Sequence, residues 1–165
     1  MKMSQLIFHA DNCSLGMKIE TSALRELLKT CAQSGRQETG GILWGYYDEG
    51  LVMASVTKVS GPPLDSVRGN YSFVRGVRGV QEMVSRLWNL KRRQYYLGEW
   101  HFHPYSVPTP STTDISQMIS HANDNKLSCP EPLLVIVGGN PKGDWSIHAS
   151  LFERGGTVHT LRLSS

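Results

Sequence analysis

The longest apolar run in this chain of 165 residues is Leu133-Leu134-Val135-Ile136-Val137. Five apolar residues cannot cross a membrane as a helix, which needs about 20 of them. An unbroken, β-branched run of this length is typical of a strand that is buried on both faces. The run therefore predicts a sheet with other layers packed on its two sides.

The rest of the chain supplies these layers. Apolar residues recur at helical spacing in 22–34, in 77–93 and in a segment that begins near Thr112. Strand patterns lie at 5–10, 41–47, 51–59, 95–102, 145–152 and 158–163. The order β-α-β-β-α-β-α-β-β-β indicates an α/β (α+β layered) fold. The chain shows no internal repeat and no low-complexity linker, so we expect residues 1–165 to be a single domain.

Charge and cysteine usage exclude several classes of protein. Lys and Arg number 17 against 14 Asp and Glu, and a net charge of +3 is too small to imply binding to nucleic acid or a membrane. Three cysteines without a Cys-x-x-Cys pair exclude a disulfide scaffold and a four-cysteine zinc module. They favour a reducing compartment, and the N-terminus lacks the apolar stretch of a secretory signal, so we expect a cytoplasmic protein.

Basic residues near the second predicted helix leave nucleic-acid binding open as an alternative. They are Arg75, Arg78, Arg86 and the run 91–93. The run falls at the expected C-terminus of the helix, where cations complement the helix dipole, so a solvated face is the favoured interpretation.

Residues 98–104, Gly-Glu-Trp-His-Phe-His-Pro, are the most informative segment. Side chains alternate between the two faces of a strand. Trp100 and Phe102 would then face a core, whereas Glu99, His101 and His103 would share the opposite face. Two imidazoles placed in this way can reach one metal ion. A catalytic zinc site uses three protein ligands and one water, so a third ligand is needed.

Asp114 is the expected third ligand. The spacing His101-x-His103-x7-Ser111-x2-Asp114 contains a proline-rich loop that is long enough to fold back beside the histidines. Ser111 and Asp114 also fit an ordinary helix start, as the N-cap and a first-turn carboxylate. The two interpretations are compatible, because one helix start can hold both a capping serine and a metal-binding carboxylate.

A zinc site of this kind benefits from a general base, and the chain has no His-Glu-x-x-His motif that would supply it. The best candidate is Glu38, in Gln37-Glu38-Thr39-Gly40-Gly41. The two glycines would let backbone or substrate approach closely. On spacing alone, an ordinary surface glutamate that follows a helix is the alternative.

Glu38-Thr39-Gly40-Gly41, His101-Phe102-His103-Pro104, Ser111 and Asp114 together resemble the motif of the JAMM (MPN+/JAB) zinc metalloproteases. The resemblance implies the MPN/JAB fold, which is cytidine-deaminase-like, with a curved mixed sheet flanked by helices. It implies that His101, His103 and Asp114 bind one Zn²⁺ per chain. It also implies that Glu38 is the general acid/base and that Ser111 steadies the tetrahedral intermediate or the catalytic water.

Among members of this family, the chain most resembles the JAB-type deconjugating peptidases of bacterial CBASS anti-phage operons, which are encoded beside E1/E2-like proteins. That resemblance implies hydrolysis of the amide bond after the C-terminus of a conjugated nucleotidyltransferase-type cyclase. The alternatives are processing of the C-terminal tail of a small ubiquitin-like or sulfur-carrier protein, and a non-catalytic MPN scaffold. An extended tail usually binds beside a sheet edge, which makes Asn70, Tyr71, Phe73 and Val74 candidate substrate contacts. Packing of these four residues back on the core is an equally good explanation.

Overall fold

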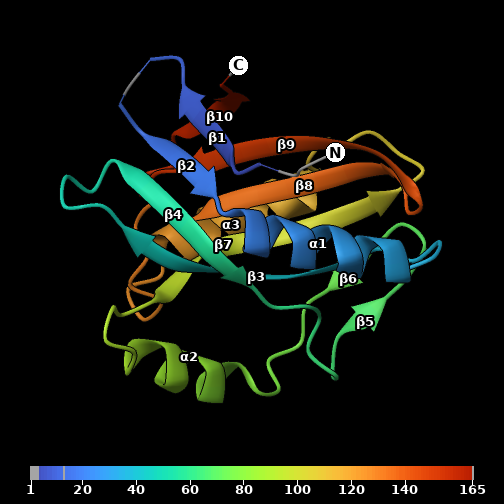
Figure 1. Ribbon diagram of the computed structural model, residues 1–165, viewed down its shortest axis with the longest axis horizontal. Coiled ribbons are helices and arrows are strands. Elements are labelled where there is room, and N and C mark those ends of the chain that lie inside the picture. The colour runs from blue at the N-terminus through green and yellow to red at the C-terminus, as the bar shows by residue number, and fades with distance from the viewer. Residues whose placement is uncertain (1–3, 13, 165) are drawn as a thin grey trace.

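The computed structural model describes residues 4–12 and 14–164 of the chain. Eight strands form one sheet that closes on itself in the order β1-β10-β9-β8-β7-β3-β4-β2 (Figure 1). They are β1 (Leu6–Ala10), β2 (Gly16–Ile19), β3 (Thr39–Tyr47), β4 (Met53–Val59), β7 (Tyr95–Pro104), β8 (Leu133–Asn140), β9 (Gly143–Phe152) and β10 (Val158–Leu163). The helices are α1 (Thr21–Gln33), α2 (Val80–Trp88) and α3 (Thr112–Asn123), and β5 (Val67–Arg68) pairs with β6 (Phe73–Val74) in a separate hairpin.

The apolar run that predicts a doubly buried strand lies in β8. Strand β8 lies between its parallel neighbour β7 and its antiparallel neighbour β9, and all five side chains of the run are buried. Val135 and Val137 belong to the main core, whereas Leu134 and Ile136 pack against α3. The layered α/β fold is therefore confirmed, and the strand is buried because each of its faces meets a different layer.

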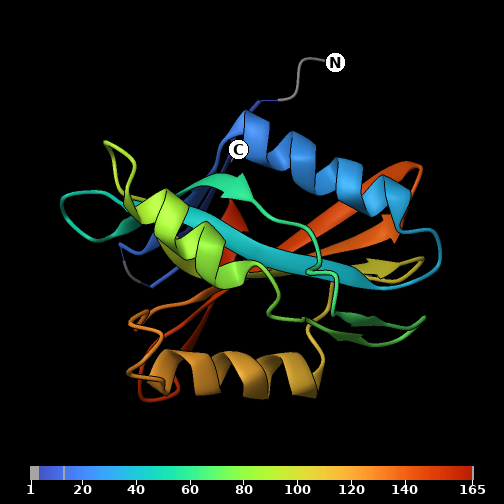
Figure 2. The same cartoon turned by 90° about the horizontal axis from the view of Figure 1, so that it is seen from below.

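Helices cover both sides of the sheet (Figure 2). Leu24, Leu27 and Cys31 of α1 join the main core on one side. On the opposite side, α3 packs on β8 and Leu87 of α2 packs on Ile42 of β3. None of the helices in the described part of the chain is long and apolar enough to span a membrane.

Three features of the structure differ from the sequence expectations. The curved mixed sheet closes into a barrel, because β1 pairs with β10 and with β2, and β2 runs parallel to β4. Strand β2 was not predicted, since its four residues are too few to show a periodic pattern. The two strands of the β5–β6 hairpin were not predicted either, since each has only two residues.

The second helix is also shorter than the predicted 77–93 and ends at Trp88. The basic run 91–93 therefore lies beyond the helix rather than in its last turn. The guanidinium of Arg92 lies 3.5 Å from the centre of the Tyr46 ring, and that of Arg93 lies 4.8 Å from the Trp88 ring. Stacking on aromatic rings accounts for these two cations without a nucleic acid.

Strands β3 and β7 provide the platform for the site. Trp100 and Phe102 are buried in the main core, as the alternation predicts. Gly40 and Ile42 of β3 lie opposite His101 and Glu99 of β7. Cross-strand partners share a face, so His101 and Glu99 project from the side of the sheet that α2 and α3 cover. That side therefore carries the candidate ligands.

Candidate metal centre

His101, His103 and Asp114 converge at the end of β7 and the start of α3. Each of the three side chains offers one ligand atom, and these atoms lie within 4.8 Å of one another. His101 Nδ1 is 2.9 Å from Asp114 Oδ1, and His103 Nε2 is 4.0 Å from Asp114 Oδ2. The loop between the histidines and Asp114 thus folds back as its length suggests.

Asp114 is held in place by the helix start. Ser111 is the N-cap of α3, and its hydroxyl accepts a hydrogen bond from the Asp114 amide at 3.1 Å. The Asp114 carboxylate accepts hydrogen bonds from the Ser111 amide and hydroxyl, each at 2.7 Å. This capping box confirms the helix-start interpretation and orients the carboxylate toward the histidines.

Electrostatics at Asp114 favour an ionised ligand. Burial alone would raise the pKa of this carboxyl group, but hydrogen bonds from His101 and Ser111 and the charge of His101 outweigh it and lower the pKa to about 2. At His103 burial lowers the pKa against the opposing effect of the Asp114 charge. The ionised carboxylate that these contacts favour at Asp114 and the neutral imidazole that burial favours at His103 are forms that bind a divalent metal.

The donor set fits a tetrahedral zinc ion. With ligand bonds of about 2.0–2.1 Å, neighbouring donor atoms in a tetrahedron are about 3.3 Å apart. The three donor atoms lie within 4.8 Å of one another. Two nitrogens and one oxygen are thus close enough to share a single ion, and all three side chains come from structured elements.

Glu38 lies immediately before β3, at the edge of the same site. It lines a cleft of about 360 Å³ together with His103. Burial and the nearby Asp114 charge raise the pKa of the Glu38 carboxyl group, and His101 opposes them. The Glu38 amide donates to the Gly69 carbonyl at 2.7 Å, and Arg68 Nε donates to the Glu38 carbonyl at 3.0 Å. The structure thus brings the predicted base, its backbone fixed by the hairpin, to the candidate ligands.

The four candidate substrate contacts take different positions. Asn70 and Tyr71 line the cleft. Phe73 instead packs edge-on against His101, with ring centres 5.4 Å apart and planes at 78°. Val74 is exposed on the hairpin and is not among the residues that line the cleft.

The cleft also contains residues that the sequence reasoning missed, namely Arg36, Pro104, Tyr105 and Ser106. The Arg36 guanidinium lies 5.6 Å from the centre of the Tyr105 ring. Tyr105 has a φ of 59°, in the left-handed region that non-glycine residues seldom adopt. Its sequence position directly after His103-Pro104 was the available signal, whereas Arg36 gave none.

Comparisons with known proteins identify the family of the chain. The model of the prokaryotic homologues of the JAB domain matches residues 20–148. A protein of Enterobacter hormaechei subsp. hoffmannii named "CD-NTase/cGAS isopeptidase" is 36% identical over 162 residues, which cover 98% of this chain and 89% of that protein. A protein of Sinorhizobium fredii named "Probable metalloprotease y4qB" is 28% identical over 133 residues, covering 79% of this chain and 80% of that protein.

The solved structures agree on the fold. The solution structure of a Desulfitobacterium hafniense protein superposes with a TM-score of 0.62, at 19% identity, over 89% of this chain and 88% of that one. At this identity the likeness supports the fold alone. The family model, which matches most of the chain, and the relative named as an isopeptidase, which is matched over 98% of this chain, support a more specific assignment. The chain belongs to the prokaryotic JAB-domain family and is a hydrolase of the JAMM metalloprotease type.

Proposed function

We propose that this protein is a zinc-dependent isopeptidase that releases a conjugated protein by hydrolysing the amide bond after its C-terminus. The observation that carries the proposal is that Glu38 shares one cleft with His103, whose donor atom is grouped with those of His101 and Asp114, and that the charges of these two residues act on Glu38. The relative named as an isopeptidase covers 98% of the chain, and its name supports a conjugated CD-NTase/cGAS-type protein as the substrate. We infer a role in anti-phage defence from this substrate.

His101, His103 and Asp114 would hold the zinc ion, one per chain. When bound, zinc supplies Lewis-acid polarisation of the scissile carbonyl and acidifies water. Glu38 accepts the proton of the attacking water at its carboxylate and passes it to the leaving lysine or main-chain amine. The Ser111 hydroxyl donates its one proton to Asp114 in this structure, and by turning that proton toward the reacting centre it would steady the attacking water or the tetrahedral intermediate.

The substrate tail would enter along the hairpin. Asn70 and Tyr71 face the cleft, and the β5–β6 hairpin pairs with no other strand among the described residues. An extended chain can add to such an edge by main-chain hydrogen bonds. We propose that Phe73 supports the hairpin by packing against His101, and that the exposed side chain of Val74 contacts the substrate tail.

We also infer a single peptidase domain over residues 1–165, because β1 and β10, near the two ends, pair with each other. Cys31 and Cys129 are free thiols, which agrees with a reducing cytoplasm as the site of action.

The test is cleavage of a reporter fused after the C-terminus of the conjugated cyclase, with a ubiquitin-like or sulfur-carrier tail fused to the same reporter for comparison. We expect release of the reporter from the cyclase tail, and Glu38→Gln should lower kcat by about 10²- to 10⁴-fold. Glu38→Gln is nearly isosteric, so its fold and metal content should match the wild type. Turnover by Glu38→Gln at the wild-type rate would refute the role of this residue, and cleavage of the other tail alone would refute the substrate.

A further inference from the structure

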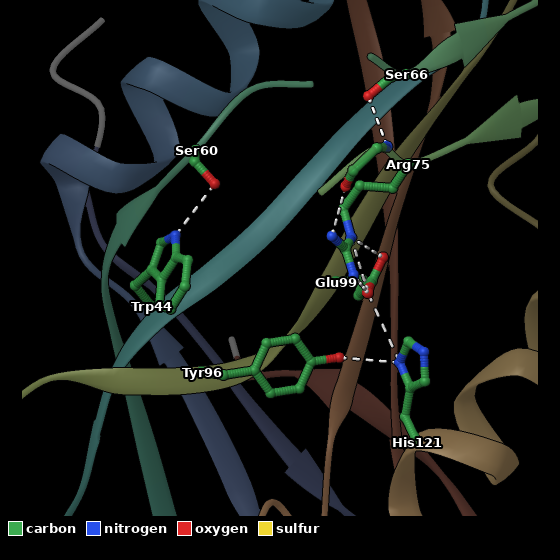
Figure 3. Close-up of polar contacts among 8 residues, drawn as sticks. Trp44, Ser60, Ser66, Arg75, Tyr96, Glu99 and His121 are labelled. Atoms are coloured by element: carbon green, nitrogen blue, oxygen red, sulfur yellow. Dashed lines mark hydrogen bonds and ion pairs between the residues drawn. The ribbon is translucent and has the colours of Figure 1, made fainter. Parts of the chain in front are cut away.

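A buried ion pair lies beside the candidate metal centre and has no part in the proposed chemistry. The Glu99 side chain on β7 is 1% exposed. Arg75 Nε donates to both of its carboxylate oxygens at 3.1 Å, and Arg75 Nη2 lies 3.0 Å from Oε1 (Figure 3). A guanidinium that contacts both oxygens of a carboxylate fixes the orientation of the two side chains and also pairs their charges.

The same carboxylate also faces α3. His121 Nδ1 lies 3.6 Å from Glu99 Oε1 and 3.1 Å from the hydroxyl of Tyr96 (Figure 3). His121 belongs to the helix whose first turn carries Asp114. Glu99 is therefore in contact with residues from the hairpin side and from α3, while its own strand carries the two histidines.

Arg75 connects Glu99 to the hairpin. It directly follows β6, and the segment around it is closed by local bonds. The Gly76 amide donates to Ser66 Oγ at 2.9 Å, and the Val77 and Arg78 amides donate to the Asp65 carboxylate at 3.0 Å. Because both ends of the hairpin are tied together in this way, an anchor at Arg75 restrains the whole segment.

The position of the hairpin in turn affects the site. Its Phe73 ring lies against His101, and Gly69 and Arg68 hold both backbone polar groups of Glu38. Asn70 and Tyr71, on the tip between β5 and β6, form one wall of the cleft. A displacement of the hairpin would therefore change the wall on which an extended substrate rests.

We propose that Arg75 and Glu99 are positioning residues that tether the β5–β6 hairpin over the cleft. In the sheet Glu99 lies between Ile42 and Leu134, both buried apolar residues, so its place in the strand does not itself require a charge. Burial of an ion pair among apolar neighbours carries a desolvation cost and seldom adds net stability. The directional contact with the hairpin is what the pair supplies and an apolar residue would not.

Hydrogen exchange of backbone amides in Arg75→Met tests the tether directly. The Glu38 amide is the measure of hairpin exchange, because its hydrogen bond to the Gly69 carbonyl joins the hairpin to the residue before β3. We expect it to exchange at least about tenfold faster, while the amides of β8 exchange as in the wild type. If about one tenth of the molecules then hold the hairpin closed, KM for the fused substrate rises about tenfold and kcat changes less than threefold. Unchanged exchange in the hairpin, or an equal rise in every strand, would overturn the proposal.

Two further variants keep the test decisive. Arg75→Met/Glu99→Met removes both charges and should recover the melting temperature lost in Arg75→Met, yet keep the fast hairpin exchange and the raised KM. Recovery of KM together with stability would show a merely structural role. If Arg75→Met does not fold, Arg75→Lys takes its place. Lysine keeps the positive charge but cannot donate to both carboxylate oxygens as a guanidinium does, so hairpin exchange should be intermediate. Wild-type exchange in Arg75→Lys would then refute the tether.

Arg162→Met is the matched control, because it removes an exposed arginine paired with Asp11 and should leave hairpin exchange and KM unchanged. The kinetic part of the inference rests on the proposed isopeptidase function. If the wild type cleaves none of the fusions, that function fails, and the exchange data alone decide the tether.

Discussion

Gly40→Ala is the most specific perturbation of the candidate site, because it adds one methyl group against a candidate ligand. A Cβ at residue 40 would lie 2.9 Å from Cδ2 of His101 and 2.7 Å from Cε1 of Phe73, and it would overlap the carbonyl oxygen of Trp100. These are all tighter than ordinary van der Waals contact. The residue before His101 and the imidazole itself must therefore shift.

The size of the shift follows from these distances. Restoring ordinary contact of about 3.4 Å moves the His101 ring by about 0.5 Å and the Phe73 ring by about 0.7 Å. Overpacking of this kind costs about 1–3 kcal/mol, which lowers Tm by about 2–12 °C in a domain of this size. A misplacement of about 1 Å costs about a hundredfold in rate, so kcat/KM should fall about ten- to a hundredfold.

Two glycine controls separate strain at the site from strain elsewhere. Gly45 lies in β3 like Gly40, but away from the histidines. In Gly45→Ala the new Cβ would overlap the Ser55 carbonyl of β4, so stability should fall while kcat/KM is retained. In Gly61→Ala the nearest heavy atom is Thr30 Cγ2 at 3.7 Å, and both quantities should stay at wild-type values. The assays are thermal unfolding, zinc titration and cleavage of the reporter fusion. A Gly40→Ala enzyme with wild-type zinc affinity and kcat/KM would refute the reasoning.

Three further predictions concern the metal, the helix start and the thiols. Chelation with 1,10-phenanthroline should stop cleavage, one equivalent of Zn²⁺ per chain should restore it, and activity in a metal-free sample verified by elemental analysis would contradict the zinc assignment. Ser111→Ala removes the hydroxyl that caps α3 and binds Asp114, so it should cost about 1 kcal/mol in urea unfolding and weaken zinc binding, whereas Ser111→Thr should preserve both. Burial raises the pKa of the Cys31 and Cys129 thiols to about 12, so about one molecule in 10⁴ carries either thiolate at pH 8. Peptide mapping after iodoacetamide treatment should find both unmodified in the native protein and alkylated in guanidinium, and rapid native labelling would contradict their burial.

The candidate site was predictable to the extent that local patterns encode it. The alternation in 98–104 separates Trp100 and Phe102 from the two histidines, because strand side chains alternate whatever the sheet around them. The distance between His103 and Asp114 could be bounded from loop length, and the cap at Ser111 could be identified from residue type.

The hairpin could not be predicted in the same way. Its two strands have two residues each, and its position comes from Arg75 reaching Glu99, 24 residues away. No periodic pattern marks a contact of this kind. For the same reason Arg75 looked like one of several surface cations, although its side chain contacts a buried carboxylate.

The sequence by itself determined the layered α/β fold, the strand buried on both faces and the residue types of a nitrogen- and oxygen-based candidate metal site. These properties depend on periodicity and on the chemistry of side chains, which are local. Only the tertiary structure decided that the sheet closes, that Glu38 meets His103 at one cleft, and that an ion pair anchors the cleft wall. These features arise from packing between segments far apart in the chain, where small differences in burial free energy between alternative arrangements select one of them.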